Sequence, residues 1–206
     1  MGTSGLTGQD LCRKYINTAY LTSHNSHVST KYGYTLTDQH LDLGEQLEAG
    51  VRSFMLDTWH KSQFTKQWQA STRYDNLSDK EVYLFHGPDK GDLPGFTVPV
   101  NLTPDSLDRV RFSTWIKKMC AWLREHPTEI LTLHLENHGV TAQQFTDELS
   151  RLSLADARMI MERSNYQAIK TLTLQDIVDS QQHAAAVRQQ RREEVRARRL
   201  HHQSRQ

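Results

Sequence analysis

The stretch that decides the fold is Ile130-Leu131-Thr132-Leu133-His134-Leu135-Glu136-Asn137-His138, an apolar run that closes on polar residues. Three earlier apolar runs close in the same way, before His24-Asn25, on Asp57 and before His86. Short apolar runs of this kind are typical of buried strands. Parallel strands separated by helices bring their C-terminal ends to one rim, where reactive side chains gather. The sequence therefore predicts an α/β fold whose polar strand ends share one site.

Helical patterns occur between and after these runs. Apolar residues recur every three to four positions from Ser106 to His126, which predicts an amphipathic helix that ends before Pro127. A shorter helix is predicted for residues 36–49, where Gly50 follows as a C-cap. A third is predicted for residues 141–152, with a threonine as its N-cap.

The C-terminal tail differs in composition from the rest of the chain. Residues 183–206 contain seven arginines against two glutamates, whereas the whole chain has a formal net charge of +1. Because large apolar residues are scarce there, we expect this tail to be helical or disordered. Its arginines suit peripheral contact with an anionic membrane. Nucleic acid is not an expected partner, since the remaining residues are slightly acidic and show no stacking motif.

Signals for targeting and for cross-linking are weak. The N-terminus lacks the apolar core of a signal peptide, and no apolar run reaches transmembrane length. A cytoplasmic or membrane-peripheral protein is therefore expected by default. Cys12 and Cys120 are too few for a disulfide scaffold, and we expect two free thiols.

Four segments together carry a family resemblance. They fall in the order and approximate spacing of the X region of phosphatidylinositol-specific phospholipases C, and they are Thr22–Ser26, Gly50–Asp57, Leu84–Gly87 and Glu129–His138. The chain resembles this phosphodiesterase superfamily from about residue 10 to about residue 182.

The resemblance implies a TIM-type (β/α) barrel. A complete eight-stranded barrel typically needs about 250 residues, and the chain has 206. The family would continue into a fifth apolar strand after residues 172–180, and we expect none to follow there. We therefore expect residues 10–182 to form only the N-terminal half of the catalytic barrel, with residues 183–206 as a basic tail.

The resemblance also implies that His24 and His86 are the catalytic residues. Cleavage of a phosphodiester needs a base for the attacking hydroxyl and an acid for the leaving alkoxide, and histidine titrates in the right range for both. His24 would act as base or would stabilise the transition state, and His86 would act as acid. The sequence leaves the division of these roles open.

Asn25, Asp57 and Glu136 match the cation ligands of the metal-dependent enzymes in this superfamily. An amide oxygen and two carboxylates are hard ligands, which suit Ca²⁺ or Mg²⁺, and the resemblance favours Ca²⁺. The chain departs from that pattern at Met55, where those enzymes have a second carboxylate on the same strand. A thioether is a poor ligand for a hard cation, so weaker binding is expected.

Three further residues near the motifs have weaker claims to a functional role. Arg52 precedes the second apolar run and is expected to form an ion pair at the far end of the barrel rather than to bind phosphate. His138 would support Glu136 without binding the cation directly, and His134 would be a packed, hydrogen-bonded residue.

The function that the resemblance implies is phosphoric diester hydrolysis of the phospholipase C type, on a phosphoinositide or a related phospholipid. A glycerophosphodiester phosphodiesterase or phospholipase D-like enzyme is an alternative, and a non-catalytic lipid-binding or metal-binding module is another. Half a barrel would expose unpaired strand edges and an apolar face. We therefore expect it to associate with a second copy or aggregate, and to have weak or no activity.

Overall fold

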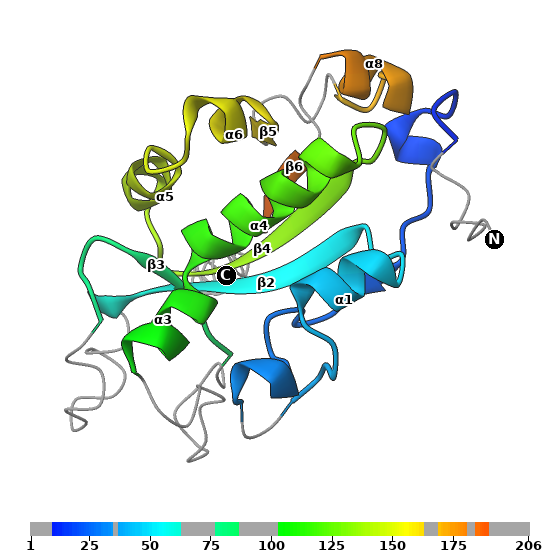
Figure 1. The fold of residues 1–206 in the computed structure, drawn as a ribbon. Helices are drawn as coiled ribbons and strands as arrows, with labels where there is room; N and C mark the ends of the chain where they lie inside the picture. The colour runs from blue at the N-terminus through cyan, green and yellow to red at the C-terminus, as the bar shows by residue number, and fades with distance from the viewer. Residues whose placement is uncertain are drawn as a thin grey trace, which may run out of the picture.

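The computed structural model describes residues 10–34, 37–62, 77–86, 103–162, 169–180 and 184–189, with only the backbone described for residues 161–162 and 184–189. These residues form a mixed α/β structure around one largely parallel sheet (Figure 1), as the sequence predicts. Within this described part, no helix is both long enough and apolar enough to cross a membrane.

The sheet has six strands, five of them parallel. Its order is β1-β2-β4-β6-β5. Strand β3 pairs in the antiparallel direction with the C-terminal part of β2, beyond the part that pairs with β1. The strands are β1 (Thr22–Ser23), β2 (Ser53–His60), β3 (Val82–Leu84), β4 (Leu131–His138), β5 (Ile160–Glu162) and β6 (Ala184–Gln189). Among the described strands the sheet is open, with β1 and β5 at the two ends of this order.

The antiparallel direction of β3 corrects the expectation that the run before His86 is another parallel strand. Thr58 pairs with Leu84, and His60 pairs with Val82. The ring of His60 forms hydrogen bonds with Ser62 Oγ and with the main-chain oxygen of Asp79, each at 2.8 Å. These bonds connect the end of β2 to the segment that precedes β3. An antiparallel neighbour needs no crossover helix, so the chain returns directly alongside β2.

Strand β6 corrects the expectation of a helical or disordered tail for the six residues that it contains. It lies parallel to β4, with Leu133 opposite Ala186. The Ala-Ala-Ala-Val run at 184–187 is apolar enough for a strand inside a parallel sheet, but the surrounding arginines and glutamines hide the pattern. The expectation that the sheet stops near Ser180 is therefore wrong, and so is the expectation that no fifth strand follows. The short β5, also parallel, was not predicted.

The helices agree with the sequence patterns except at their boundaries. The predicted helix over 106–126 is broken at Arg111, whose extended backbone bridges to Tyr83 and whose guanidinium bonds Glu81 Oε2 at 3.0 Å. The helix predicted over 36–49 starts later, because Asp42 and Glu45 form a capping box at its N-terminus. The described helices are η1 (Tyr15–Asn17), η2 (Thr30–Tyr32), α1 (Leu43–Glu48), α3 (Pro104–Val110), α4 (Phe112–Glu125), α5 (Ala142–Leu149), α6 (Leu154–Arg158) and α8 (Leu174–Asp179).

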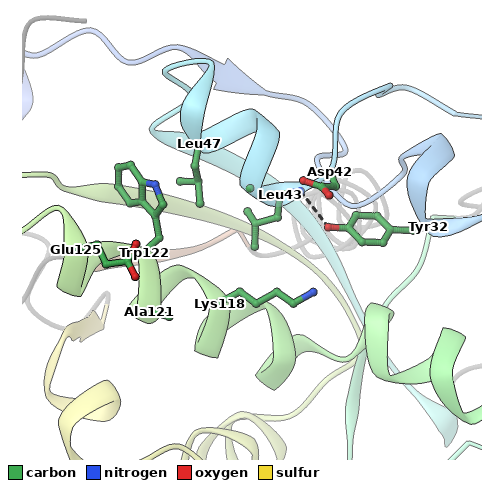
Figure 2. Close-up of a pocket in the computed structure, with 9 residues that line it drawn as sticks. Tyr32, Asp42, Leu43, Leu47, Lys118, Ala121, Trp122 and Glu125 are labelled. Carbon is green, nitrogen blue, oxygen red and sulfur yellow. Dashed lines mark hydrogen bonds between the residues drawn. The ribbon is translucent and has the colours of Figure 1, made fainter. Parts of the chain in front are cut away.

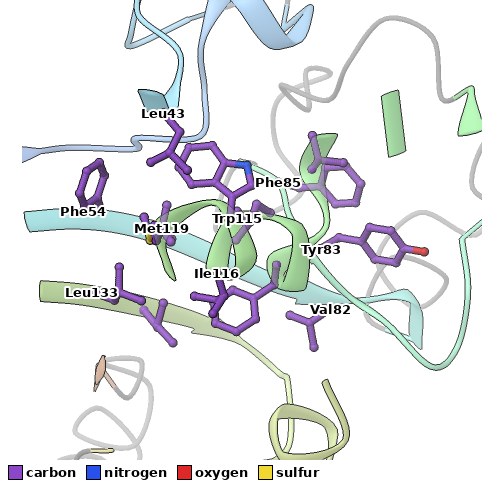
Figure 3. Close-up of a cluster of buried hydrophobic side chains, with 14 of the residues drawn as sticks. Leu43, Phe54, Val82, Tyr83, Phe85, Trp115, Ile116, Met119 and Leu133 are labelled. Carbon is purple, nitrogen blue, oxygen red and sulfur yellow. The ribbon is translucent and has the colours of Figure 1, made fainter. Parts of the chain in front are cut away.

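The core lies between the sheet and the helices α1 and α4. Phe54 of β2 and Leu133 of β4 point toward Trp115 and Met119 of α4 and toward Leu43 of α1 (Figure 3). Successive strand side chains alternate between the two faces of a sheet. The residues between these apolar ones on β2 and β4 therefore lie on the opposite face, away from the helical core.

The N-terminal ends of β2 and β4 are joined by a buried ion pair. Arg52 Nε lies 2.8 Å from Glu129 Oε2, and the side chains are only 16% and 12% exposed. Arg52 also donates to the main-chain oxygen of Leu47 at 2.7 Å and lies over the ring of Trp122. The expectation of a structural ion pair for Arg52 is thus confirmed.

Both cysteines are free thiols, as expected, with Cys12 exposed and Cys120 buried.

Candidate active site

A polar cluster lies where β2 and β4 run side by side. The parallel register places Asp57 opposite Glu136 and Trp59 opposite His138. Ligand atoms of Asp57, Glu136 and His138 all lie within 4.8 Å of one another. Asp57 and His138 are buried, whereas the Glu136 side chain is 44% exposed. The cluster is therefore built into the sheet but remains open to solvent through Glu136.

His86 joins this cluster through Asp57. Its Nδ1 lies 2.7 Å from Asp57 Oδ2. The antiparallel return of β3 brings His86 back along β2, so the two residues meet although 29 positions separate them. The sequence predicts that His86 and Asp57 share one rim, but it does not predict this hydrogen bond, and β3 runs in the direction opposite to the one expected.

The hydrogen bond between these residues favours the charged form of both. It raises the pKa of His86, against the opposing effect of burial, and the charges of Asp57, Asp38 and Glu136 act in the same direction. Burial raises the pKa of Asp57, but the His86 hydrogen bond and the charges of the nearby histidines outweigh it, so that the pKa falls below its usual value. Since the carboxylate holds Nδ1, Nε2 is the ring nitrogen of His86 that is left for proton exchange.

Asn25 lies in the loop that follows β1. Ser26 donates its main-chain N–H to the main-chain oxygen of Met55 at 2.9 Å, which places this loop beside the part of β2 that leads to Asp57. Asn25 is buried and has a φ of 45°, the only positive value among the described residues other than glycine. Its Nδ2 donates to Asp38 Oδ2 at 2.6 Å. The side-chain oxygen of Asn25 is therefore the atom available to a cation.

The described contacts do not bring the side chain of His24 into the cluster. The residue is exposed, and Gln39 Nε2 donates to its main-chain oxygen at 2.6 Å. The side chain of His24 forms no hydrogen bond or ion pair with the described residues. It is placed on the loop next to Asn25, within the same strand-end region, without a contact that orients its ring.

His27 and Asp38, which no sequence motif singles out, also lie at this site. The buried ring of His27 has a pKa lowered to about 4, chiefly by burial, while the charges of Asp57 and Asp38 oppose this effect. His27 is thus neutral at physiological pH. Asp38 holds Asn25 from 13 positions away. Neither residue belongs to a local sequence pattern that marks it as part of a site. Only the folded structure brings them close to the other site residues.

His138 lies closer to the cluster than expected. Its Nε2 is 3.4 Å from Glu136 Oε1, and its ring stacks on Trp59 with centroids 4.1 Å apart and an angle of 4° between the planes. Met55 lies on the same face as Asp57, opposite His134, whose pKa burial lowers. The alternation of side chains along β4 is the signal that groups His134, Glu136 and His138 on one face.

The donor set fits a divalent cation. Asp57 and Glu136 supply two carboxylates and His138 supplies an imidazole, while Asn25 offers an amide oxygen from the loop that bonds to β2 at Met55. Carboxylate, amide and imidazole are all common ligands of divalent ions. The candidate cation site predicted by sequence is therefore chemically coherent for Asp57 and Glu136.

A separate pocket lies on the other side of the sheet, between α1 and α4 (Figure 2). It has a volume of about 370 Å³, and its lining includes Leu47, Lys118 and Trp122. At its edge the hydroxyl of Tyr32 accepts a hydrogen bond from the Leu43 N–H at 2.9 Å. None of the predicted site residues lines this pocket.

Fold and site together define an α/β protein with a carboxylate and histidine cluster on adjacent parallel strands. Comparison with models of known protein families and with curated proteins finds no match for this chain. The functional proposal therefore depends on the geometry and on the motifs themselves.

Proposed function

We propose that the protein is a phosphoric diester hydrolase of the phospholipase C type, acting on a phosphoinositide or a related phospholipid. The observation that carries this proposal is the hydrogen-bonded pair of His86 and Asp57 beside Glu136 on the neighbouring parallel strand. An imidazole that is oriented by a carboxylate, next to a second carboxylate, is suited to proton transfer at a phosphate ester.

We also propose that the sheet is part of a TIM-type (β/α) barrel. In support, β1, β2, β4 and β6 are parallel and lie side by side in chain order. The helices α1 and α4 pack on one face of β2 and β4, and the polar cluster occupies the other. The position of β5 outside β6 departs from simple chain order. The arrangement of α1 and α4 matches a barrel, in which helices cover the outer surface and the site lies at the C-terminal ends of the strands.

Each histidine has a distinct task in the proposed reaction. A hydroxyl next to the phosphate attacks phosphorus while His24 accepts its proton. The new oxygen–phosphorus bond closes a cyclic phosphate as the bond to the lipid alkoxide breaks. His86 then donates its Nε2 proton to that alkoxide. The raised pKa of His86 supports the acid role, because it increases the protonated fraction of the imidazole at a given pH.

Asp57 has two functions in this scheme. One carboxylate oxygen orients His86, and its charge stabilises the imidazolium. Asp57 and Glu136, with Asn25 beside them, would hold a divalent cation. When bound, that cation supplies positive charge to the phosphoryl oxygens and lowers the pKa of the attacking hydroxyl.

The direct test is hydrolysis of phosphatidylinositol in mixed micelles, with phosphorus NMR to detect a cyclic phosphate. Replacement of the acid, His86→Gln, should lower the rate by about 10²-fold to 10⁴-fold. His126→Gln is the matched control, since His126 caps the far end of α4 and stacks on Trp122. Equal rates for His86→Gln and the unaltered chain would refute the assignment of His86.

The same measurement with other substrates separates the alternative functions. Release of glycerol phosphate from a glycerophosphodiester would indicate a glycerophosphodiester phosphodiesterase. Lipid or metal binding without hydrolysis of any diester would indicate a non-catalytic module and overturn the proposal.

A further inference from the structure

We propose that His138 binds the cation of this site directly, together with Asp57 and Glu136, and that the site therefore selects a transition-metal ion such as Mn²⁺ or Zn²⁺ over Ca²⁺. The inference deepens the proposed function and rests on it for the role of the ion. Binding of the ion itself is tested without any substrate.

Geometry is the first support. Glu136 and His138 are two positions apart on β4 and lie on one face, and the register with β2 sets Asp57 opposite Glu136. Ligand atoms from all three lie within 4.8 Å of one another. Two ligands held about 2.1 Å from an ion in tetrahedral geometry are about 3.4 Å apart. His138 Nε2 and Glu136 Oε1 are separated by 3.4 Å, so one ion can contact both.

The ring of His138 is held in place before any ion binds. It stacks on Trp59, with centroids 4.1 Å apart and planes 4° from parallel. Both residues are buried, and they are paired across the β2–β4 ladder. An imidazole that is already oriented loses little side-chain entropy when it binds a metal.

The charge of the cluster also suits a cation. Asp57 and Glu136 both lie within the cluster, and His86 occupies only one carboxylate oxygen of Asp57. The other oxygen is left for an ion. His86 partly offsets the negative charge of the two carboxylates. Asp38 lies near enough for its charge to act on His86, so it adds negative charge to the surroundings of the cluster.

The kind of donor decides which ion is favoured. Ca²⁺ takes six to eight oxygen ligands, whereas imidazole suits Zn²⁺ and other transition metals. Met55, on the same face as Asp57, offers a thioether where an oxygen would be needed to extend a calcium shell. Two carboxylates and one nitrogen are thus a better match for Mn²⁺ or Zn²⁺ than for Ca²⁺.

The test uses the full chain after removal of metals with a chelator. Calorimetric titration with Mn²⁺, Zn²⁺, Ca²⁺ and Mg²⁺ should show one site that prefers the first two ions. His138→Gln should weaken Mn²⁺ binding by at least about tenfold, the loss typical even of residues that only orient metal ligands. His134→Gln is the matched control, because His134 lies on the same strand and face on the other side of Glu136. It should leave the affinity unchanged.

A spectroscopic measurement keeps the test decisive if the His138 variant does not fold. Electron spin-echo measurements on the unaltered chain with Mn²⁺ should show coupling to an imidazole nitrogen. The coupling should persist in His86→Gln, which excludes His86 as its source. Absence of nitrogen coupling, or tighter binding of Ca²⁺ than of Mn²⁺ and Zn²⁺, would overturn the inference.

Failure of this inference and failure of the proposed function give different results. Selective Mn²⁺ binding through His138 without hydrolysis of any diester would leave the metal assignment standing and remove the enzyme assignment. Hydrolysis supported by Ca²⁺, with no effect of His138→Gln on metal affinity, would leave the enzyme assignment standing and remove the metal assignment.

Discussion

Nδ1 of His86 lies 2.7 Å from Oδ2 of Asp57, a contact between the residue that follows β3 and a residue inside β2. The contact exists because β3 returns antiparallel to β2. It makes Asp57 both the partner that orients His86 and a member of the carboxylate cluster. The pKa of His86 and the change of stability with pH both depend on this pair.

The first prediction concerns the pKa of His86. Asp57→Asn keeps a side chain of similar shape but removes the negative charge, so the pKa of His86 should fall. Asp38→Asn should lower it less, because Asp38 acts through its charge and without the hydrogen bond. Proton NMR titration of the His86 ring in metal-free protein measures both shifts. Equal effects of the two variants would contradict the hydrogen bond as the main cause.

The second prediction concerns how stability changes with pH. The pKa of His86 is raised in the folded protein, so the stabilisation that it provides is fully present below its ordinary pKa of 6.5 and is lost as the pH rises through the folded value. The pKa of Asp57 is lowered, so its contribution is present above 3.8 and is lost as the pH falls through the folded value. The free energy of unfolding, measured in urea, should therefore differ most between the unaltered chain and His86→Gln from pH 3.8 to pH 6.5.

That difference should shrink at alkaline pH. The side chain of His86 is 39% exposed, so solvent screens the pair and the effect is modest. A difference that grows steadily above neutral pH would contradict the sign of the pKa shift.

The third prediction concerns the left-handed backbone of Asn25. Asn25→Gly and Asn25→Ala both remove the amide that bonds Asp38, but only glycine adopts a φ of 45° without strain. Asn25→Ala should therefore be less stable than Asn25→Gly by about 1 kcal/mol. Chemical denaturation compares the two variants directly. Greater stability of the alanine variant would show that the loop does not require this conformation.

The fourth prediction tests the packing of the sheet on α4. Leu133 is buried in the core, so Leu133→Ala should lower the free energy of unfolding by about 2–5 kcal/mol. Leu154→Ala removes the same atoms from a residue that is 68% exposed and should have little effect. Thermal unfolding followed by circular dichroism measures both. Similar losses for the two variants would contradict the described core.

The fifth prediction separates a structural role for Arg52 from phosphate binding. Arg52→Met removes the guanidinium that pairs with the buried Glu129 carboxylate and should destabilise the protein by about 3 kcal/mol. A double variant that also carries Glu129→Met should recover part of this loss. The rate per folded molecule should not change, because the pair lies at the end of β2 and β4 opposite the cluster. A weaker affinity for substrate in both variants would instead indicate phosphate binding.

Several features of the site follow from local sequence. The apolar runs that lead to Asp57, His86 and Glu136 identify β2, β3 and β4, since short buried strands leave such runs along the chain. The strands β2 and β4 continue beyond these runs, to His60 and His138. The sequence also supports the ion-pair role of Arg52.

Other features depend on pairing partners that no local pattern encodes. The direction of β3 and the insertion of β6 between β4 and β5 are set by contacts between distant segments, and the alanines of β6 carry a weak signal of their own. Asp38 reaches Asn25 only through the fold.

The sequence by itself determined the α/β class and the strands that lead to Asp57, His86 and Glu136. Only the tertiary structure decided that His86 reaches Asp57 by an antiparallel return, and that His138 lies within 4.8 Å of both carboxylates. The reason is physical: each strand records in its own residues which side chains are buried, whereas strand direction and neighbours are fixed by long-range backbone hydrogen bonds, which any residue but proline can donate.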